Sequence, residues 1–442
     1  MSTDCFQNNV GVGVPRVLLP AGNADYYKWA VVACDQYTSQ PEYWARADAI
    51  VGGSPSTLRL ILPEAFLGQP DEAARIEAIN SSMRACLRDG ILEEQEQGFV
   101  LVTRRVAGKT LTGLVLSLDL EQYDYTKGAA TLIRATEQTI VERIPPRLRI
   151  RADAPLELPH ILVLIDDPAN SVIGPLVNKK ADLPCLYDTE LMLGGGHITG
   201  HLVSDGADIS AVLASLTALV DPEAFAAKYG PDKAPLLFAM GDGNHSFATA
   251  KANWERIKAS LPQEKRWNHP ARYALVEIQN LHNDGIVFEP IHRVVFGISG
   301  DEAVQSLLSL LKAQNGGVTV SIGDLPMPTG GETHVLPFIT GDTCGAFTVA
   351  KPGAQLAVGT LQNAVDALLR ERADAHVDYI HGADVVRDIA AKGGAIGFLL
   401  PAMEKNELFQ TVVFDGALPR KTFSMGEANE KRYYMECRSL TN

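Results

Sequence analysis

The sequence predicts an α/β or α+β protein with mixed sheets, and three observations support this class. The apolar run 235–240 is followed by a glycine turn at 241–246 and a helical stretch at 247–258, which is the order strand, turn, helix. Other apolar runs of strand length alternate with amphipathic segments on both sides of this unit. After residue 299 the pattern changes to helices and short β runs with Gly and Pro turns, which is typical of an α+β unit.

Each element is predicted from the period of its apolar residues. Ile76, Ile79, Met83 and Cys86 recur at steps of three and four, so residues 71–89 should form an amphipathic helix that Gly90 ends. Further helices are predicted at 209–220, 247–258 and 301–314, and from residues 361 and 383 onward. Strands are predicted at 114–120, 160–165, 235–240, 273–281, 287–295, 395–400, 410–414 and 431–438, and Pro290 should interrupt the fifth.

The chain is too long for one ordinary domain, since its 442 residues correspond to roughly two or three units of about 150 residues. Pro145 and Pro146, followed by the basic segment 147–151, mark a joint near residue 150. We therefore expect an N-terminal α+β segment at 1–150, a central unit with the glycine turn at 151–299, and a C-terminal α+β segment at 300–442. Loops from all three should build one shared cleft.

Charge and composition restrict the partners. Lys plus Arg is 39 against 53 Asp plus Glu, a formal net charge of −14 that disfavours nucleic acid and an anionic membrane as partners. No apolar run reaches the about 18 residues of a membrane helix, so no membrane association is expected. The start lacks the basic and apolar regions of a signal peptide, and the scattered cysteines form no Cys-x-x-Cys pair. These features predict a cytoplasmic protein with reduced thiols, and they leave self-association open.

The glycine turn is the first candidate site, and it consists of Gly241, Asp242, Gly243, Asn244, His245 and Ser246. The first N–H groups of a helix have no internal partners and carry partial positive charge, so an anion fits there. The glycines allow a close backbone approach, Asn244 and Ser246 can cap or donate, and His245 can act as donor or base near pH 7. Phosphate binding is the predicted use. The alternative is an ordinary turn in which Asp242 or Asn244 caps the helix and His245 is a satisfied polar residue.

Two other segments carry residues suited to phosphate. His292 and Arg293 follow Pro290, where Arg can grip a phosphate and His can move a proton. The segment 419–427 contains Lys421, Thr422 and Glu427, which suit phosphate and Mg²⁺. The alternatives are a His–Arg pair bonded to backbone at a sheet edge and a basic surface loop.

The segment 134–143 spaces its charges so that they could share one helix face, with Arg134 and Glu137 as substrate-binding or structural candidates. Solvated intrahelical pairs would explain the same spacing. His197 and His201 stand four apart, but the surrounding glycines argue against a helix, so no dedicated metal site is predicted. A serine-hydrolase Gly-x-Ser-x-Gly is absent, and Ser246 stands where a dinucleotide-binding loop would have its third glycine.

Seven short motifs occur in an order that resembles the family called domain of unknown function 1015, and the resemblance spans nearly the whole chain. They lie at residues 33–37, 54–58, 133–137, 164–167, 241–246, 290–293 and 418–422. The family's central motif, usually Asp-Gly-His-His-Arg, is similar to the phosphate-binding motif of the ParB, sulfiredoxin and free serine kinase group. The resemblance implies a central ParB-like unit with a nucleotide pocket.

Asp242, Gly243 and His245 match that motif, whereas Asn244 replaces its first His and Ser246 replaces its Arg. The second replacement removes a cation from the expected phosphate site. Three cations elsewhere in the chain could substitute for it: Arg293, Lys421 and Lys251.

The resemblance implies a phosphotransferase that uses ATP or ADP with Mg²⁺ to phosphorylate a small hydroxyl metabolite such as free serine. In this scheme His245 or Asp242 accepts the substrate proton, and Arg293 and Lys421 neutralise the developing charge. The phosphates would be held by Gly241, Gly243, Asn244, Ser246, His292, Lys421 and Thr422. One alternative is a ParB-like nucleotide-binding regulator without turnover. Another is a phosphoester hydrolase with Asp166, Asp167 and His245 around a metal.

Overall fold

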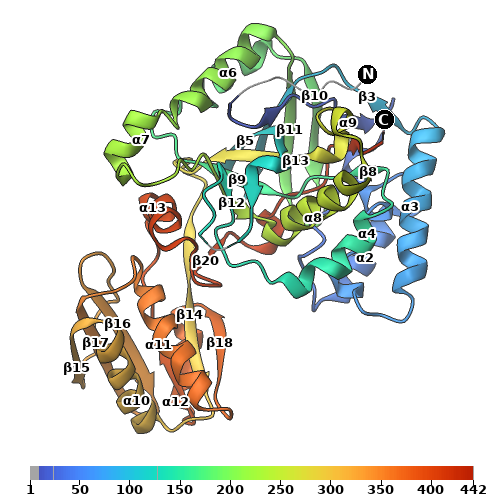
Figure 1. The fold of residues 1–442 in the computed structure, drawn as a ribbon. Helices are drawn as coiled ribbons and strands as arrows, with labels where there is room; N and C mark the ends of the chain where they lie inside the picture. The colour runs from blue at the N-terminus through green and yellow to red at the C-terminus, as the bar shows by residue number, and fades with distance from the viewer. Residues whose placement is uncertain (1–8, 23, 127, 442) are drawn as a thin grey trace. The chain divides into compact units, whose positions relative to one another are not determined.

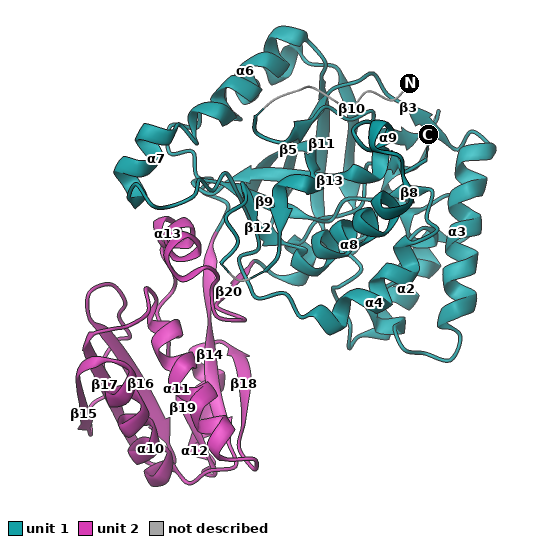
Figure 2. Ribbon diagram, in the orientation of Figure 1, with its two compact units in different colours: residues 1–286, 426–442 teal, residues 287–425 magenta. Residues whose placement is uncertain are grey.

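The computed structural model describes residues 9–22, 24–126 and 128–441. The N-terminal residues on which the signal-peptide expectation rests lie mostly outside this range. The chain forms two compact units: unit 1 comprises residues 1–286 and 426–442, and unit 2 comprises residues 287–425 (Figures 1 and 2).

Unit 1 is built on a ten-stranded mixed sheet. Its strand order is β10 (Cys185–Leu191), β11 (Gly196–Val203), β4 (Phe99–Val106), β5 (Lys109–Asp119), β13 (Tyr273–Asn280), β9 (Leu162–Ile165), β12 (Phe238–Asp242), β7 (Ile133–Arg134) and β6 (Tyr123–Asp124), and β1 (Val12–Gly13) pairs with β5. β9 runs parallel to β13 and antiparallel to β12. Such mixed pairing confirms the predicted α+β class.

Both faces of this sheet are covered, because side chains alternate from face to face along each strand. On β4, Leu101 packs in one hydrophobic core, and its neighbours Val100 and Val102 pack in the other. The first core includes apolar residues of α6 (Gly206–Ala218) and α8 (Asn244–Ser260), and the second includes residues of α2 (Pro41–Val51) and α3 (Glu72–Arg88). The helix predicted at 71–89 is thus confirmed, with Met83 on its buried face.

Shorter elements complete unit 1. They are α1 (Tyr26–Trp29), α4 (Ile144–Arg151), α5 (Gly174–Asn178), α7 (Pro222–Tyr229), α9 (Gln263–Arg266), the pair β2 (Leu18–Pro20) with β3 (Leu92–Glu94), and the pair β8 (Leu156–Glu157) with β21 (Arg438–Ser439). α4 packs against α8, and this contact brings the basic segment 147–151 beside the glycine turn region.

The C-terminal segment 426–442 is held in unit 1 by buried ion pairs. Arg432 pairs with Glu277 of β13 and lies 2.6 Å from a carboxylate oxygen of Glu436, and Arg438 donates to Glu157 at 2.8 Å. Buried charges are tolerated when they are paired in this way. The strand predicted at 431–438 is wrong for most of its length, since the strand β21 includes only its last residue.

Unit 2 has a seven-stranded antiparallel sheet and four helices. The strands are β15 (Gly316–Ile322), β17 (Thr343–Lys351), β16 (His334–Thr340), β19 (Ala395–Phe398), β14 (Phe288–Phe296) and β18 (His376–His381) in that order, with β20 (Phe423–Met425) also on β14. The helices are α10 (Gly300–Gln314), α11 (Ala357–Glu371), α12 (Ala383–Ala391) and α13 (Lys405–Asp415).

Two predictions for unit 2 are wrong. The strand predicted at 410–414 is part of α13, which a capping box of Glu404 and Glu407 begins and Gly416 ends in a left-handed conformation. Pro290 does not interrupt β14, because it pairs with Phe423 of β20.

The predicted three-part division differs from the two units of the structure. Residue 150 lies inside α4, and the sheet of unit 1 combines strands from both sides of that position. The C-terminal residues return to unit 1. Long-range strand pairing and the buried ion pairs account for the difference. Neither produces a change of composition along the sequence that would mark a boundary.

One stretch of the described residues, Gly206–Tyr229, is long and apolar enough to cross a membrane by length and composition, with a hydropathy of 1.4 in its 18-residue window. The structure divides this stretch, since α6 ends at Ala218 and α7 begins at Pro222. A spanning helix needs about 20 residues, and α6 has 13. The stretch is therefore weak evidence for a membrane segment.

Candidate functional site

The glycine turn joins the end of β12 to the start of α8, as predicted. Gly243 has φ +77°, and a Cβ atom there would lie 3.2 Å from the Cα of Ile161, so glycine is required both by conformation and by space. The Asp242 carboxylate accepts the Gly243 N–H at 2.9 Å, and its other oxygen lies 3.2 Å from Nζ of Lys431. Asp242 therefore stabilises the turn and is already paired with a cation. Gly241, the preceding residue, lies in β12 and packs against Leu164.

His245 is held in its neutral form. Its Nε2 accepts the N–H of Ile140 at 3.3 Å, so the nitrogen that would take a proton already has a donor. Burial, followed by the positive charges of Arg147 and Arg143, lowers the pKa of His245 to about 4. Burial is the largest cause, and the two arginines place positive charge near the turn. The geometry thus supports a binding role for the turn more than the predicted role of His245 as a base.

The side chains of Asn244 and Ser246 differ in their hydrogen-bond partners. The Oδ1 atom of Asn244 is buried and has no hydrogen-bond partner within the described part of the chain. The Oγ atom of Ser246 lies 2.7 Å from Nε2 of His160, and Nδ1 of that histidine lies 3.0 Å from the hydroxyl of Tyr434. The Tyr434 hydroxyl also accepts the N–H of Cys34 at 3.1 Å. These contacts form a chain of hydrogen bonds that begins on α8.

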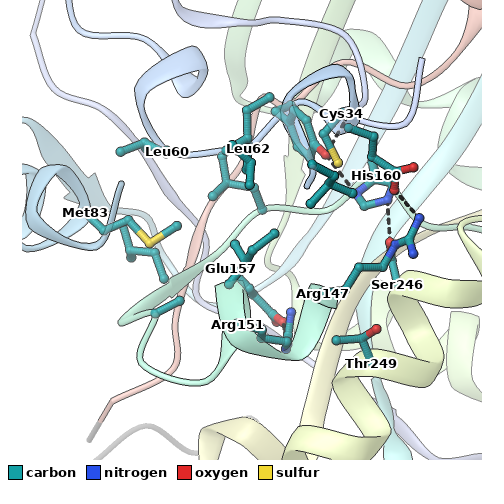
Figure 3. Close-up of a pocket in the computed structure, with 18 residues that line it drawn as sticks. Cys34, Leu60, Leu62, Met83, Arg147, Arg151, Glu157, His160, Ser246 and Thr249 are labelled. Atoms are coloured by element: carbon teal, nitrogen blue, oxygen red, sulfur yellow. Dashed lines mark hydrogen bonds and ion pairs between the residues drawn. The ribbon is translucent and has the colours of Figure 1, made fainter. Parts of the chain in front are cut away.

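This chain of hydrogen bonds lines one end of a cavity of about 130 Å³ in unit 1 (Figure 3). Much of the remaining wall is apolar and is formed by Leu60, Ile61, Leu62, Leu67, Met83, Ile150, Ala154, Leu156 and Leu158. Two arginines also line the cavity, and each is paired with a carboxylate that lines it: Arg147 with Glu64, and Arg151 with Glu157. Glu157 is also paired with Arg438, so it is shared by two arginines. The cavity therefore combines an apolar body, a hydroxyl–imidazole end and paired charges.

Sequence reasoning missed His160, Tyr434 and Arg147 as site residues. His160 stood at the start of a predicted strand, and Arg147 was used only as the mark of a joint. Cys34 lies in one of the seven motifs, which was a signal that its neighbourhood belongs near the glycine turn. Tyr434 gave no local signal, because the return of the C-terminal segment places it there.

Arg293 does not have the predicted phosphate-binding geometry. It belongs to unit 2, is 0% exposed, and donates to the carbonyl oxygens of Lys421 and Arg420, each at 2.9 Å. It also donates to Oε1 of Gln362 at 3.1 Å and lies over the ring of Tyr379. A guanidinium whose donors are used in this way is a structural anchor, so the role in charge neutralisation is corrected.

The other predicted residues of unit 2 are also in structural positions. Nδ1 of His292 accepts the N–H of Leu400 at 3.1 Å, and burial, followed by the charge of Arg293, lowers the pKa of His292 to about 4. Thr422 donates its hydroxyl to the carbonyl of Pro419 at 2.6 Å, and Lys421 has φ +53° and accepts from Arg293. These residues belong to unit 2, whereas the glycine turn belongs to unit 1.

The helix predicted at 134–143 is wrong. Arg134 ends β7, and its guanidinium donates to the carbonyls of Ala234 and Pro235 at 2.7 and 2.9 Å, so it is a structural residue. Glu137 follows β7 and lies before the short turn of helix that begins at Val141. Glu427 caps the single helical turn 428–430, which is a structural role.

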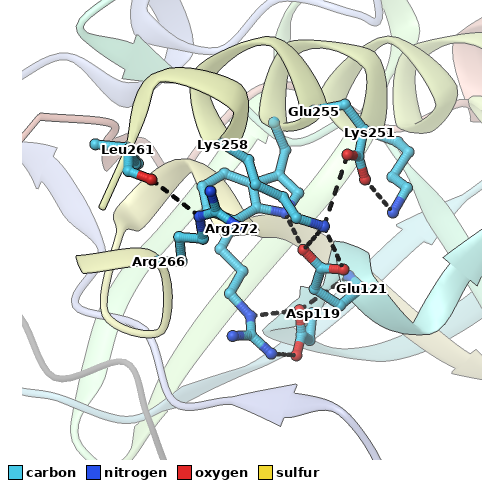
Figure 4. A network of polar contacts seen from close by, with 9 residues as sticks. Asp119, Glu121, Lys251, Glu255, Lys258, Leu261, Arg266 and Arg272 are labelled. Carbon is cyan, nitrogen blue, oxygen red and sulfur yellow. Dashed lines mark hydrogen bonds and ion pairs between the residues drawn. The ribbon is translucent and has the colours of Figure 1, made fainter. Parts of the chain in front are cut away.

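Lys251, the third cation proposed as a substitute, is also in an ion pair with a carboxylate of the protein. Its Nζ lies 2.8 Å from Glu255 on α8, beside a network in which Lys258 pairs with Glu121 and Arg272 pairs with Asp119 (Figure 4). Such networks stabilise the packing of α8 on the sheet.

The alternative site for a metal-dependent hydrolase is not assembled. Asp242 pairs with Leu162 at the start of β9, whereas Asp166 and Asp167 follow its other end, so His245 and these carboxylates are separated by about 10 Å of strand. Asp166 is paired with Lys228 and His282, and Asp167 accepts the N–H of Val172. Within the described ranges, no group of three or more His, Cys, Asp or Glu side chains could hold a metal ion. Asp166, Asp167 and His245 therefore do not form the metal site of the hydrolase alternative.

Comparisons with known proteins give one family and several distant structures. No curated protein matches the chain. A free serine kinase in complex with AMP is similar at 13% identity and a TM-score of 0.38, over 74% of this chain and 92% of that one. A conserved hypothetical protein from Pyrococcus furiosus is similar at 12% identity and a TM-score of 0.34, over 74% of this chain and 95% of that one. SbnI from Staphylococcus aureus, truncated at its C-terminus, has 12% identity and a TM-score of 0.26, over 62% of this chain and 85% of that one.

These distant likenesses carry no weight for function, which is argued below from the residues of this chain. The family match is of another kind, since it extends over residues 18–372 and includes the glycine turn. The chain belongs to the family described as "Protein of unknown function (DUF1015)".

Proposed function

We propose that this protein is a nucleotide-dependent phosphotransferase that phosphorylates a small hydroxyl compound. One observation carries the proposal: the first turn of α8 faces a positive field and, through Ser246, also lines the cavity. A phosphoryl group at the amides of that turn would therefore lie beside a hydroxyl compound in the cavity. Transfer of a phosphoryl group depends mainly on such positioning and on charge stabilisation.

The cations that would hold the phosphates are on neighbouring segments of unit 1. Arg143 and Arg147 lower the pKa of His245, and Lys431 is paired with Asp242 in the turn. Arg147 would take the place of the motif's Arg, which Ser246 replaces. ATP or ADP is the proposed donor, and no step is assigned to a protein-held Mg²⁺. Location in the cytoplasm is part of the proposal, and the five described cysteines are free thiols, as that location requires.

The test is to incubate the protein with ATP or ADP and a panel of alcohols that includes free serine, and to follow phosphorylated product by ³¹P NMR. Arg147→Gln should weaken nucleotide binding by about tenfold, whereas Arg84→Gln, at an exposed position of α3, should leave it unchanged. Failure to bind either nucleotide would contradict the proposal.

A regulator that binds nucleotide without turnover is the second candidate. The engaged Nε2 of His245 and the replacement of the motif's Arg by Ser246 favour it. Calorimetry that shows nucleotide binding, together with no product from any alcohol, would select the regulator over the transferase.

A further inference from the structure

The hydrogen bonds around His160 fit a tautomer that leaves its Nε2 free to accept. Nδ1 lies 3.0 Å from the hydroxyl of Tyr434, whose oxygen can accept from an Nδ1–H. With the proton on Nδ1, Nε2 is the unprotonated nitrogen, and it accepts the proton of Ser246, whose Oγ lies 2.7 Å away.

This arrangement is that of an activated hydroxyl. A serine hydroxyl 2.7 Å from an imidazole that is oriented by a third group can pass a proton inward. Ser246 and His160 both line the cavity, so a hydroxyl compound bound there would meet the serine oxygen first. His245, by contrast, has its Nε2 lone pair occupied by the Ile140 N–H.

The walls of the cavity indicate what kind of compound it takes. A cavity of about 150 Å³ with apolar walls holds benzene, and this one measures about 130 Å³. Arg147 is paired with Glu64, and Glu157 is shared between Arg151 and Arg438, so both carboxylates of the lining are already engaged and an ammonium group would find no partner there. Burial of an unpaired charge is unfavourable. Free serine, a zwitterion with almost no apolar surface, fits these walls poorly.

We infer that the acceptor is an alcohol with a small apolar body and no ammonium group, and that His160, acting through Ser246, is the general base that removes its proton. This inference rests on the proposed phosphotransferase function and specifies its substrate class. The apolar body would lie against the Leu60, Leu62 and Met83 side of the cavity, and the hydroxyl would lie at Ser246.

The step balances as follows. The alcohol oxygen forms a bond to the terminal phosphorus of the nucleotide, and the bond from that phosphorus to its bridging oxygen breaks. The alcohol proton moves to Oγ of Ser246 while the serine proton moves to Nε2 of His160. The products are a phosphate monoester, the shortened nucleotide and an imidazolium that returns its proton to water.

The first experiment measures binding without turnover, with benzyl alcohol as the probe. Calorimetry on the full chain without nucleotide should show that benzyl alcohol binds and that free serine does not. Ala154→Phe, which fills the cavity, should abolish this binding, whereas Ala74→Phe on the exposed face of α3 should not. Binding that is insensitive to Ala154→Phe, or stronger binding of serine, would overturn the substrate class.

The second experiment measures the rate of benzyl alcohol phosphorylation. His160→Gln and Ser246→Ala should each lower kcat by about 100-fold. His160→Gln should leave nucleotide affinity unchanged, and Ser246→Thr should recover most of the rate. The wild-type pH profile should rise through one ionisation that His160→Gln removes. A wild-type rate and profile in His160→Gln would overturn the inference but leave the phosphotransferase intact. Bound benzyl alcohol with no product from any alcohol would overturn the phosphotransferase and, with it, the assignment of the base.

Discussion

The Oγ atom of Ser246 lies 2.7 Å from Nε2 of His160, although 86 residues separate them in the chain. Ser246 belongs to the first turn of α8, and His160 directly precedes the segment that leads into β9. The antiparallel pairing of β9 with β12 brings the start of one strand to the end of the other. The contact thus depends on the sheet, and it joins the N-terminal end of α8 to an imidazole that lines the cavity.

His245 should make the protein less stable in mild acid. Its pKa is about 4 in the folded chain, against an ordinary value of 6.5, so the unfolded chain binds more protons between these values. The free energy of unfolding should therefore fall as the pH decreases from 6.5 to 4. His245→Gln should flatten this dependence when unfolding in urea is measured at several pH values.

Arg147→Gln should raise the pKa of His245 toward its ordinary value, because it removes the second-largest cause of the shift after burial. The imidazole resonances in an NMR titration measure this directly. Arg84→Gln, on the exposed face of α3, is the matched control and should leave the titration unchanged. An unchanged titration in Arg147→Gln would contradict the positive field assigned to the turn.

Gly243→Ala should destabilise unit 1 for two reasons. The left-handed backbone conformation costs about 1–2 kcal/mol for alanine, and the new Cβ adds to this cost because it would lie 3.2 Å from the backbone of Ile161. Gly90→Ala is the control, since Gly90 also has positive φ but has nothing within 4 Å of the added atom. Urea unfolding followed by tryptophan fluorescence reports on unit 1, which contains all four tryptophans of the sequence. Equal losses in the two variants would show that the contact with Ile161 is harmless.

Arg432→Met should cost about 3–5 kcal/mol of stability in unit 1, because it removes the cation that is paired with two buried carboxylates. These are Glu277 and Glu436, which are 5% and 0% exposed. The double variant Glu277→Gln, Arg432→Met should recover part of the loss, as measured by the same fluorescence assay. A single variant as stable as the wild type would show that the ion pairs do not hold the C-terminal segment.

Arg293→Met should destabilise unit 2 and leave nucleotide binding unchanged. Its guanidinium is bonded to carbonyl oxygens within unit 2, so the loss should appear as faster hydrogen exchange in β14 and in the segment before β20. Calorimetry with ADP measures the second part. A large loss of affinity without a change in hydrogen exchange would restore the role that the sequence predicted for this arginine.

Local patterns identified the elements well where a short-range preference decided the structure. The strand, glycine turn and helix at 235–258 were found because an apolar run, a left-handed glycine and a helical composition are each local properties. The same reasoning failed at 410–414, where β-branched residues suggested a strand. The cap residues Glu404 and Gly416 and the burial of one side of the segment produce a helix there.

Only about half of the candidate site could be predicted from the sequence. Order along the chain was enough to find the glycine turn and to recognise the family, since φ preferences and motif spacing are carried by neighbouring residues. Strand pairing and the return of residues 426–442 to unit 1 decided which side chains contact Ser246. Tertiary contacts also decided whether a cation such as Arg293 is available to a ligand or donates to carbonyl oxygens of the protein. Those contacts join residues far apart in sequence, and no local preference of either partner encodes them.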